Sequence, residues 1–259
     1  MINNILKCCD NLEFLNITES NQINMIYSDI LYGTGRDFGD YQDLIANKYV
    51  IENHYRPRFL EFHRVLKTDG ILTLQMDSKI SHWIRLILDD IFGYKNFQNE
   101  LIWCYRSQGF SRKKFSEKHD VILVYSKSST FYFNLEDSRE IDISESTQKR
   151  FGKEIAETGK IPTRKNGKMY YNSPYSAPRD WFIINTLPQA HPERNGYSTQ
   201  KPIELMNKLL IAFSKEFDLV ADFYCGSGSF LEAAMKLNRF YIGIDINNNA
   251  IELCKQRLK

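Results

Sequence analysis

Short apolar runs alternate along the chain with longer stretches in which apolar residues recur at helical spacing. The short runs have the length of buried β-strands, whereas stretches such as Glu52 to Leu66 and Ser81 to Phe92 are typical of amphipathic helices. This alternation predicts an α/β domain. The predicted strands are Asn4 to Cys8, Ile23 to Ser28, Ile71 to Met76, Leu101 to Tyr105, Val121 to Tyr125, Leu219 to Phe223 and Phe240 to Ile244.

The periodicity breaks between Phe131 and about Asn195, where the chain is polar and carries five prolines. Regular spacing is confined there to short runs such as Trp181 to Leu187. We interpret residues 131–196 as an inserted segment with a small structure of its own. The ranges 1–130 and 197–259 then form the two halves of one domain, a size that a chain of 259 residues can build.

Composition adds few constraints. Apolar residues make up 42% of the chain and charged residues 25%, as in ordinary soluble proteins, and no apolar run reaches the roughly 18 residues of a membrane span. Five cysteines without C-x-x-C spacing, and no signal-peptide pattern, predict a cytoplasmic protein with free thiols and no metal site. The net charge of +2 is uninformative, so nucleic-acid binding must be argued from local clusters of charge.

The clearest candidate for a binding site is a strand–turn–helix–strand unit near the C-terminus. A buried strand, Leu219 to Phe223, runs into the turn Cys225-Gly-Ser-Gly228, and a helix then leads to a second strand that ends at Asp245. An acid about 20 residues after a glycine turn can bond ribose hydroxyls in a nucleotide-binding unit. Leu231 replaces the third glycine of the dinucleotide fingerprint. This favours an adenosine ligand without pyrophosphate, such as S-adenosylmethionine, over the alternative of an ordinary strand-to-helix turn.

Only 14 residues follow Asp245, so the remaining strands of the sheet must come from upstream. The strand Asn4 to Cys8 is then expected to lie next to the strand that ends at Asp245. Asp10, just beyond it, can cap the helix that follows or reach the adenine amino group of a ligand. The two roles are compatible.

A second candidate site follows the strand Ile23 to Ser28, where Asp29-Ile-Leu-Tyr32 leads into a glycine-rich turn. The carboxyl ends of parallel strands are where α/β sheets hold their ligands, although a plain strand end and turn would explain the same residues. The polar loop Arg36 to Asp43 is expected to cover this site. Lys201, just before the helix Ile203 to Phe213, can hold a carboxylate or simply face solvent.

The loop between Leu101 to Tyr105 and Val121 to Tyr125, two strands expected to pair, combines positive charge with aromatic rings. Phe110 and Phe115 interleave with its basic residues, a combination that suits phosphate contact and base stacking. A solvated charged loop is the alternative. The candidate nucleic-acid-binding residues are Arg106, Arg112, Lys113, Lys114 and Lys118.

Taken together, these segments resemble the amino-group DNA methyltransferases, which act on adenine N6 or cytosine N4, in their permuted β-class arrangement. The resemblance spans nearly the whole chain, and it is specific because the motifs occur jointly and in order. The motifs are Asp10-Asn-Leu-Glu-Phe-Leu15, Asp29-Ile-Leu-Tyr-Gly-Thr-Gly35, Asp90-Ile-Phe-Gly-Tyr-Lys-Asn-Phe97, Asn99-Glu-Leu-Ile-Trp103, Lys118-His-Asp-Val-Ile-Leu-Val-Tyr-Ser-Lys127, Thr199-Gln-Lys-Pro202 and Asp222-Phe-Tyr-Cys-Gly-Ser-Gly228.

The resemblance implies a circularly permuted, Rossmann-like methyltransferase fold: a seven-stranded, mostly parallel sheet with an antiparallel hairpin strand. Residues 131–196 would be the target-recognition segment, between a catalytic half (1–130) and a cofactor-binding half (197–259). The catalytic tetrapeptide would be Asp29, Ile30, Leu31 and Tyr32. S-adenosylmethionine would be held by Asp10, Lys201, Asp222, Tyr224, Gly226, Ser227, Gly228, Ser229 and Asp245.

Two segments depart from the family's pattern, which has two prolines in place of Ile30-Leu31 and usually proline in place of Phe223. In the family's chemistry the acid accepts a hydrogen bond from one N–H of the target amino group and the next carbonyl accepts a hydrogen bond from the other, which draws the nitrogen lone pair out of the ring. Asp29 and the Ile30 carbonyl can supply both acceptors, and Tyr32 would stack on the flipped base. The rigidity that prolines provide must then come from packing.

These features predict a sequence-specific methyltransferase for adenine N6 in double-stranded DNA, within or derived from a restriction–modification system. The acid at position 29 favours adenine, because the cytosine-N4 enzymes more often have serine there. The alternatives are a cytosine-N4 enzyme and a DNA-binding homologue with impaired turnover; an RNA or small-molecule methyltransferase fits the long insert less well. A homodimer and a cognate restriction endonuclease remain open as partners, and no membrane partner is expected.

Overall fold

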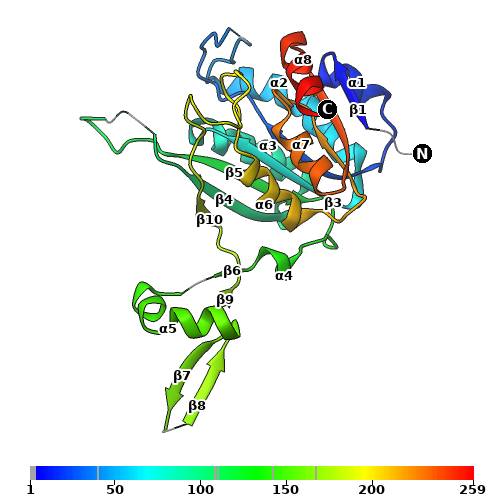
Figure 1. Ribbon diagram of the computed structural model, residues 1–259. Helices are drawn as coiled ribbons and strands as arrows, with labels where there is room; N and C mark the ends of the chain where they lie inside the picture. The colour runs from blue at the N-terminus through cyan, green and yellow to red at the C-terminus, as the bar shows by residue number, and fades with distance from the viewer. Residues whose placement is uncertain (1–3, 40, 108, 110, 142, 167) are drawn as a thin grey trace. The chain divides into compact units, whose positions relative to one another are not determined.

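The computed structural model describes residues 4–39, 41–107, 109, 111–141, 143–166 and 168–259. The chain divides into two compact units (Figure 1). The larger unit combines Met1–Phe133 with Asp180–Lys259, and the smaller unit is Asn134–Arg179. The smaller unit lies where the sequence loses its periodicity, but it is narrower than the predicted segment 131–196, because residues 180–196 belong to the larger unit.

The larger unit is built on a mostly parallel sheet, as predicted, with helices on both faces. In the described chain the sheet has eight strands, not seven, and β5 alone runs antiparallel to its neighbours β3 and β4. The hairpin of β4 and β5 confirms the predicted antiparallel element. In sheet order the strands are β1 (Ile5–Cys8), β12 (Phe240–Asp245), β11 (Leu219–Asp222), β2 (Ile23–Asp29), β3 (Leu66–Met76), β5 (His119–Ser126), β4 (Phe97–Cys104) and β10 (Trp181–Ile183).

The eighth strand, β10, comes from the segment that the sequence assigned to the insert. It pairs in parallel with the edge strand β4. Phe182 and Ile184 are buried, while Trp181 and Ile183 remain exposed, so only one face of β10 contributes to the core. The indole Nε1 of Trp103 donates to the Ile184 carbonyl at 2.7 Å, which fastens the strand to the sheet. The short apolar run was therefore an edge strand and not part of the insert.

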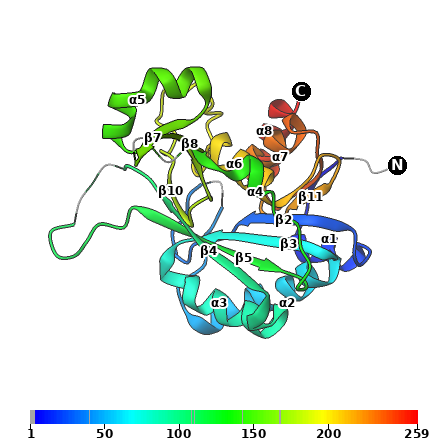
Figure 2. The same cartoon turned by 90° about the horizontal axis from the view of Figure 1, so that it is seen from below.

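Two layers of helices cover the sheet, one on each face (Figure 2). The alternation along β5 divides its side chains between them: Leu123 and Tyr125 join one core, Ile122 and Val124 the other. The first core also contains residues of α1 (Asn11–Ile17), α2 (Lys48–Val65) and α3 (Ser78–Phe92), and the second contains residues of α6 (Ile203–Phe213), α7 (Ser229–Lys236) and α8 (Asn248–Arg257). A short 3₁₀ helix, Tyr94–Asn96, leads from α3 to β4.

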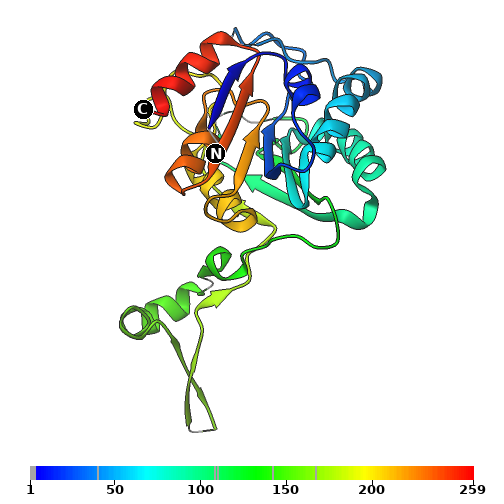
Figure 3. The same cartoon turned by 90° about the vertical axis from the view of Figure 1, so that its right-hand side faces the viewer.

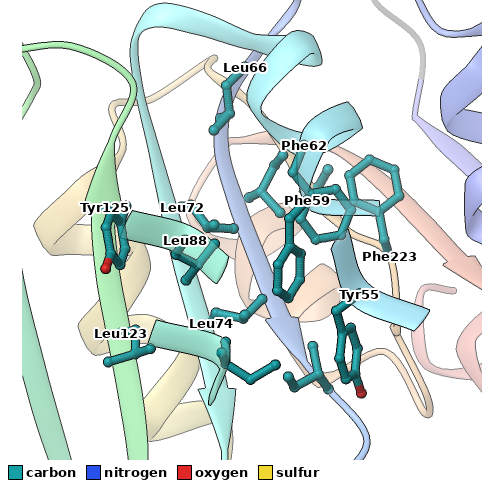
Figure 4. Close-up of a cluster of buried hydrophobic side chains, with 14 of the residues drawn as sticks. Tyr55, Phe59, Phe62, Leu66, Leu72, Leu74, Leu88, Leu123, Tyr125 and Phe223 are labelled. Atoms are coloured by element: carbon teal, nitrogen blue, oxygen red, sulfur yellow. The ribbon is translucent and has the colours of Figure 1, made fainter. Parts of the chain in front are cut away.

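Aromatic side chains of α2 form the centre of the first core (Figure 4). Tyr55 stacks on Phe59, and Phe62 stacks on Phe223 with ring centroids 5.1 Å apart. Phe223 is only 1% exposed. The residue that replaces the family's usual proline is thus an integral part of the packing between α2 and the sheet.

The two ends of the described chain meet in the sheet, where β1 lies beside β12 (Figure 3). The register pairs Cys8 with Asp245, which confirms that the strand before Asp10 neighbours the strand ending at Asp245. Since β1, β12, β11 and β2 are parallel, their carboxyl ends lie at the same edge of the sheet.

The packing of α7 on β12 explains the missing third glycine of the turn. A Cβ added at Gly243 would lie 2.3 Å from Cδ1 of Leu231, so the leucine side chain fills the space above this glycine. In a dinucleotide fingerprint the third glycine serves the same close approach of helix and strand. Here the small residue lies on the strand and the large one on the helix.

Among its described residues, the smaller unit contains two short antiparallel strand pairs and two helices. Helix α4 (Leu135–Ser138) precedes β6 (Glu140–Ile141), which pairs with β9 (Tyr175–Ser176). Helix α5 (Glu145–Thr158) leads into a hairpin of β7 (Ile161–Lys165) and β8 (Lys168–Asn172). Across both units, none of the described helices is long and apolar enough to cross a membrane.

Candidate active site

A cavity of about 710 Å³ opens at the carboxyl ends of the parallel strands in the larger unit. Segments that are far apart in the sequence meet in its lining, as parallel topology requires. All but one of the residues predicted for the catalytic and cofactor sites line it; Gly228 does not. The predicted residues in the lining are Asp10, Asp29, Ile30, Leu31, Tyr32, Lys201, Asp222, Tyr224, Gly226, Ser227, Ser229 and Asp245.

Asp29 ends β2 with its carboxylate held between two side chains. Lys201 forms an ion pair with Oδ2, and the Tyr32 hydroxyl lies 2.9 Å from Oδ1. Burial raises the pKa of Asp29, and the ammonium of Lys201 opposes this rise. The carboxylate that Lys201 holds in this structure is therefore that of Asp29, while a role of Lys201 toward a cofactor stays a prediction.

The backbone after Asp29 is fixed by hydrogen bonds and packing. The Ile30 N–H donates to the Gln75 carbonyl at 3.1 Å, and the Tyr55 hydroxyl donates to the Leu31 carbonyl at 3.1 Å. The Ile30 side chain is 2% exposed and belongs to the core under α2. A proline at position 30 could not make the first of these bonds. Hydrogen bonds and packing thus give this segment the backbone rigidity that the family's prolines provide by restricting rotation.

The glycine turn and Asp245 hold one another. The Asp245 carboxylate accepts the Gly226 N–H and the Asn247 N–H, both at 2.8 Å. Gly226 and Gly228 both have positive φ, which disfavours any side chain there. A Cβ at Gly228 would lie 2.7 Å from Sγ of Cys254, so this glycine allows the close approach of α8.

Asp222 ends β11 between the two acids already described. It is 3% exposed, and its Oδ1 accepts the Tyr224 N–H at 3.0 Å. Burial raises the pKa of Asp222 well above its usual range, and the negative charges of Asp29 and Asp245 act in the same direction. Ser229, also in the cavity lining, has a buried Oγ without a hydrogen-bond partner among the described residues.

Asp10 has the capping role predicted for it and a second contact that the sequence did not indicate. Its Oδ1 accepts the Leu12 N–H at 2.7 Å, and its Oδ2 forms an ion pair with Arg58 at 2.8 Å. Arg58 also lines the cavity, beside His54, whose ring lies 3.3 Å from the Tyr224 hydroxyl. Burial and the charge of Arg58 lower the pKa of His54 to about 4, so this imidazole is neutral at neutral pH.

The loop expected to cover the site does contribute to the cavity, through Phe38, Tyr41 and Gln42. Asp43 fixes the base of this loop, because its buried carboxylate accepts the N–H groups of Gly33 and Thr34 at 3.1 and 2.8 Å. Sequence reasoning did not assign this role to Asp43. An acid ten residues after a glycine-rich turn gave no distinctive signal.

The basic loop between β4 and β5 is exposed at Arg106, Arg112, Lys113 and Lys114. Phe115 is 99% exposed, while Phe110 lies outside the described residues. The Lys118 ammonium donates to the Ser107 carbonyl at 2.9 Å and to the Gly109 carbonyl at 3.0 Å. Lys118 therefore closes the loop on itself, and its predicted contact with DNA would compete with these bonds.

Sequence reasoning also missed Asp120, Gln75 and Tyr105, which form hydrogen bonds beside Tyr32. Asp120 is the second residue of β5 and is 4% exposed, and its carboxylate lies 2.6 Å from the Tyr32 hydroxyl. The available signal was an acid at the start of an otherwise apolar strand, inside the motif Lys118 to Lys127. It could not be interpreted without knowing that β5 lies beside β3.

Similarity to known proteins extends along nearly the whole chain. The sequence model of a family described as DNA methylase matches residues 23–256. Type II methyltransferase M.HpaI of Haemophilus parainfluenzae is 31% identical over 256 residues, which cover 98% of this chain and 73% of that protein. DNA adenine methyltransferase YhdJ of Escherichia coli (strain K12) is 25% identical over 250 residues, 96% of this chain and 80% of that protein.

Two solved structures share the fold at low sequence identity. PvuII DNA methyltransferase (cytosine-N4-specific) has a TM-score of 0.68 at 13% identity, over 99% of this chain and 88% of that one. The complex of M1.HpyAVI with S-adenosylmethionine has a TM-score of 0.58 at 15% identity, over 98% and 99%. At these identities the likeness concerns the fold alone.

The Ile30 N–H gives a test of how the segment after Asp29 is held. Replacing Ile30 with proline removes the donor to the Gln75 carbonyl, and leaving a buried carbonyl without its partner costs about 1–3 kcal/mol. We expect Ile30→Pro to lower the free energy of unfolding, measured by urea denaturation, by more than Ile30→Val. The valine variant keeps the N–H and loses one methylene, at about 0.5–1.5 kcal/mol. A proline variant as stable as the valine variant would contradict this role of the N–H.

Proposed function

The chain belongs to the family of N6/N4 DNA methylases, and from this premise we propose that it transfers the methyl group of S-adenosylmethionine to the N6 amino group of adenine in double-stranded DNA. The observation that carries the proposal is the geometry of Asp29, a half-buried carboxylate in the lining of a large cavity with a lysine as its counter-ion. Restriction–modification is the setting, as the name of M.HpaI suggests.

The chemistry requires hydrogen-bond acceptors for the target amino group. The lone pair of an exocyclic amino nitrogen is delocalised into the ring, so the nitrogen is a poor nucleophile until both N–H bonds are engaged. The Asp29 carboxylate accepts a hydrogen bond from one N–H group of the amino nitrogen, and the Ile30 carbonyl accepts a hydrogen bond from the other N–H group. The ammonium of Lys201 opposes the rise in the pKa of Asp29 that burial causes, and so favours the ionised carboxylate, which is the stronger acceptor.

The choice of adenine rests on the residue at position 29 and on one relative. A carboxylate stands where cytosine-N4 enzymes more often have serine, and YhdJ is named as an adenine methyltransferase. PvuII methyltransferase, which is cytosine-N4-specific, has the same fold, so the fold favours neither base. A cytosine-N4 enzyme is the second candidate for this reason.

The cavity suits S-adenosylmethionine, which when bound supplies an electrophilic methyl group. Its lining contains three acids at or just beyond the ends of parallel strands: Asp245, Asp222 and Asp10. The Ser229 hydroxyl, which has no hydrogen-bond partner among the described residues, can both donate to and accept from a ligand. Asp245 would bind the ribose hydroxyls, with its carboxylate oriented by the backbone N–H groups of Gly226 and Asn247. Asp10 would face the adenine, oriented by Arg58.

Contacts with DNA are assigned to two regions, each considered by itself. The exposed loop with Arg106, Arg112, Lys113 and Lys114 would bind phosphates. In the smaller unit, β8 is exposed along its whole length and presents Lys168, Tyr170 and Tyr171. Basic and aromatic side chains on an exposed hairpin suit contact with the backbone and edges of a duplex, so the smaller unit Asn134–Arg179 would recognise the target sequence.

The competing proposal, a DNA-binding homologue with impaired turnover, would have to explain why the backbone after Asp29 is held by hydrogen bonds and packing. Both carbonyls after Asp29 belong to a segment fixed by Gln75 and Tyr55, and the side chain of Ile30 fits the core. A segment freed from constraint would not be expected to keep these contacts. They support an active enzyme.

Replacing Asp29 tests the proposed function most simply. We expect Asp29→Ala to lower kcat for methyl transfer to unmethylated genomic DNA by on the order of 10²–10³, the loss typical of one hydrogen-bonding group at a reacting centre. Transfer of label from S-adenosylmethionine measures it, with RNA as a parallel substrate. Cofactor affinity, measured by calorimetry, should persist. Equal transfer by Asp29→Ala and wild type, or preference for RNA, would contradict the proposal.

Replacing Arg112, Lys113 and Lys114 together by alanine tests the basic loop. We expect DNA affinity to fall on all sequences, and each lost phosphate contact to flatten the log–log dependence on salt by about 0.9. The measurement is a salt titration of binding to a labelled duplex.

The control for this experiment is a variant with the same change in charge. Its three substituted lysines are exposed and lie outside both the cavity lining and the loop: Lys95, Lys236 and Lys255. It should keep the salt slope of the wild type. The same slope in the loop variant would place the phosphate contacts elsewhere.

A further inference from the structure

Asp120 is a buried carboxylate that the chemistry described so far does not use. Its Oδ2 lies 2.6 Å from the Tyr32 hydroxyl and accepts the Gln75 Nε2–H at 2.9 Å, and its Oδ1 accepts the Tyr105 hydroxyl at 2.9 Å. At 4% exposure the carboxylate has exchanged water for these three donors. Such a group is costly to bury unless its bonds are all made.

The Tyr32 hydroxyl lies between two carboxylates and has only one proton. Asp29 Oδ1 lies 2.9 Å from it and Asp120 Oδ2 lies 2.6 Å from it. The hydroxyl oxygen also accepts the Gln75 Nε2–H at 3.2 Å. A tyrosine can donate to one acceptor at a time, so Asp29 and Asp120 compete for the same proton.

The outcome of this competition matters for Asp29. One of its oxygens is paired with Lys201, and the other faces the hydroxyl. Oδ1 keeps both of its lone pairs for a target amino group only when the Tyr32 proton points to Asp120. A hydroxyl that donates to Asp29 would compete with the amino proton that the reaction needs there.

Asp120 is held in the orientation that favours this outcome. The Gln75 amide is fixed at its other end, because its Oε1 accepts the Tyr27 hydroxyl at 2.9 Å, so its N–H group must face Asp120 and Tyr32. Tyr105 fixes the second carboxylate oxygen. Gln75 and Asp120 lie on the neighbouring strands β3 and β5, whose register is set by the sheet.

We propose that Asp120 is a positioning residue for methyl transfer: it accepts the Tyr32 hydroxyl, which keeps Asp29 Oδ1 open for the target amino group and fixes the ring that stacks on the base. The inference rests on the proposed function. Asp120 acts through Tyr32 and does not itself touch the reacting atoms. Without Asp120 the hydroxyl turns to Asp29, and the catalytic acceptor is partly blocked by its own neighbour.

A double-mutant cycle between Asp120 and Tyr32 tests the proposal, since it isolates their coupling from any general damage. Asp120→Ala is expected to lower kcat on unmethylated genomic DNA about tenfold or more in the wild-type background, with KM for S-adenosylmethionine little changed. In the Tyr32→Phe background there is no hydroxyl to redirect, so the same substitution should cost less than about threefold.

Two further variants separate this role from packing. Asp120→Asn keeps an acceptor oxygen for Tyr32, because the Tyr105 hydroxyl can turn to accept from the new amide, and it should retain most of the activity that Asp120→Ala loses. Asp120→Leu fills the volume without an acceptor and replaces Asp120→Ala in the cycle if the alanine variant does not fold. Tyr105→Phe removes the other hydroxyl on the same carboxylate and should show no coupling to Tyr32.

The outcomes are distinct. If Asp120→Ala lowers kcat by a larger factor in the wild-type background than in the Tyr32→Phe background, the result supports the role of Asp120. Equal losses in the two backgrounds, or no loss in either, overturn it while the proposed function stands. Absence of transfer by the wild type to genomic DNA, which contains every short recognition sequence, overturns the proposed function and this inference with it.

Discussion

The ion pair of Lys201 and Asp29 is the interaction on which the site depends. It joins residues 172 positions apart, the turn before α6 and the end of β2, and so connects the two halves of the larger unit across the cavity. Burial of Asp29 without a cation would favour its protonated form, and a protonated acid is a poor acceptor for an amino group. The lysine thus favours the ionised carboxylate that the proposed methyl transfer requires.

Neighbouring side chains compensate for two departures from the family's pattern, at Ile30 and Phe223, and for one departure from the dinucleotide fingerprint, at Leu231. Ile30 fills a core position and its N–H bonds to β3; Phe223 stacks on Phe62 of α2. Leu231 occupies the space that Gly243 leaves on the adjacent strand. In all three cases a larger side chain replaces a residue that restricts or frees the backbone, and close packing supplies the rigidity instead. These substitutions fit a maintained fold better than relaxed constraint.

Much of this arrangement could be predicted from local patterns in the sequence. Apolar runs predicted the strands, and the position of Asp245 close to the end predicted that β1 would neighbour β12. The acids at strand ends could be assigned to one cavity because parallel strands bring their carboxyl ends together. What could not be predicted depends on lateral contacts: the edge strand β10, which follows a polar insert, and the ion pair of Arg58 with Asp10.

Asp120 is a functional example of a residue whose contacts could not be predicted from local sequence patterns. Its role becomes visible only when β5 lies beside β3 and the carboxylate reaches Tyr32, 88 positions away in the chain. At Gly228 the motif predicts contact with a ligand, and the structure adds a close approach of Cys254 that the sequence did not indicate. Sequence patterns predicted which residues line the cavity, whereas the hydrogen-bond geometry inside it required the three-dimensional arrangement of the strands.

The central claim is that the Asp29 carboxylate receives an adenine amino group. Its most direct test is the identity of the product: unmethylated genomic DNA is incubated with the protein and methyl-labelled S-adenosylmethionine, digested to nucleosides and analysed by mass spectrometry. The account predicts label in N6-methyldeoxyadenosine. Label in N4-methyldeoxycytidine, or nucleosides without label, would contradict it.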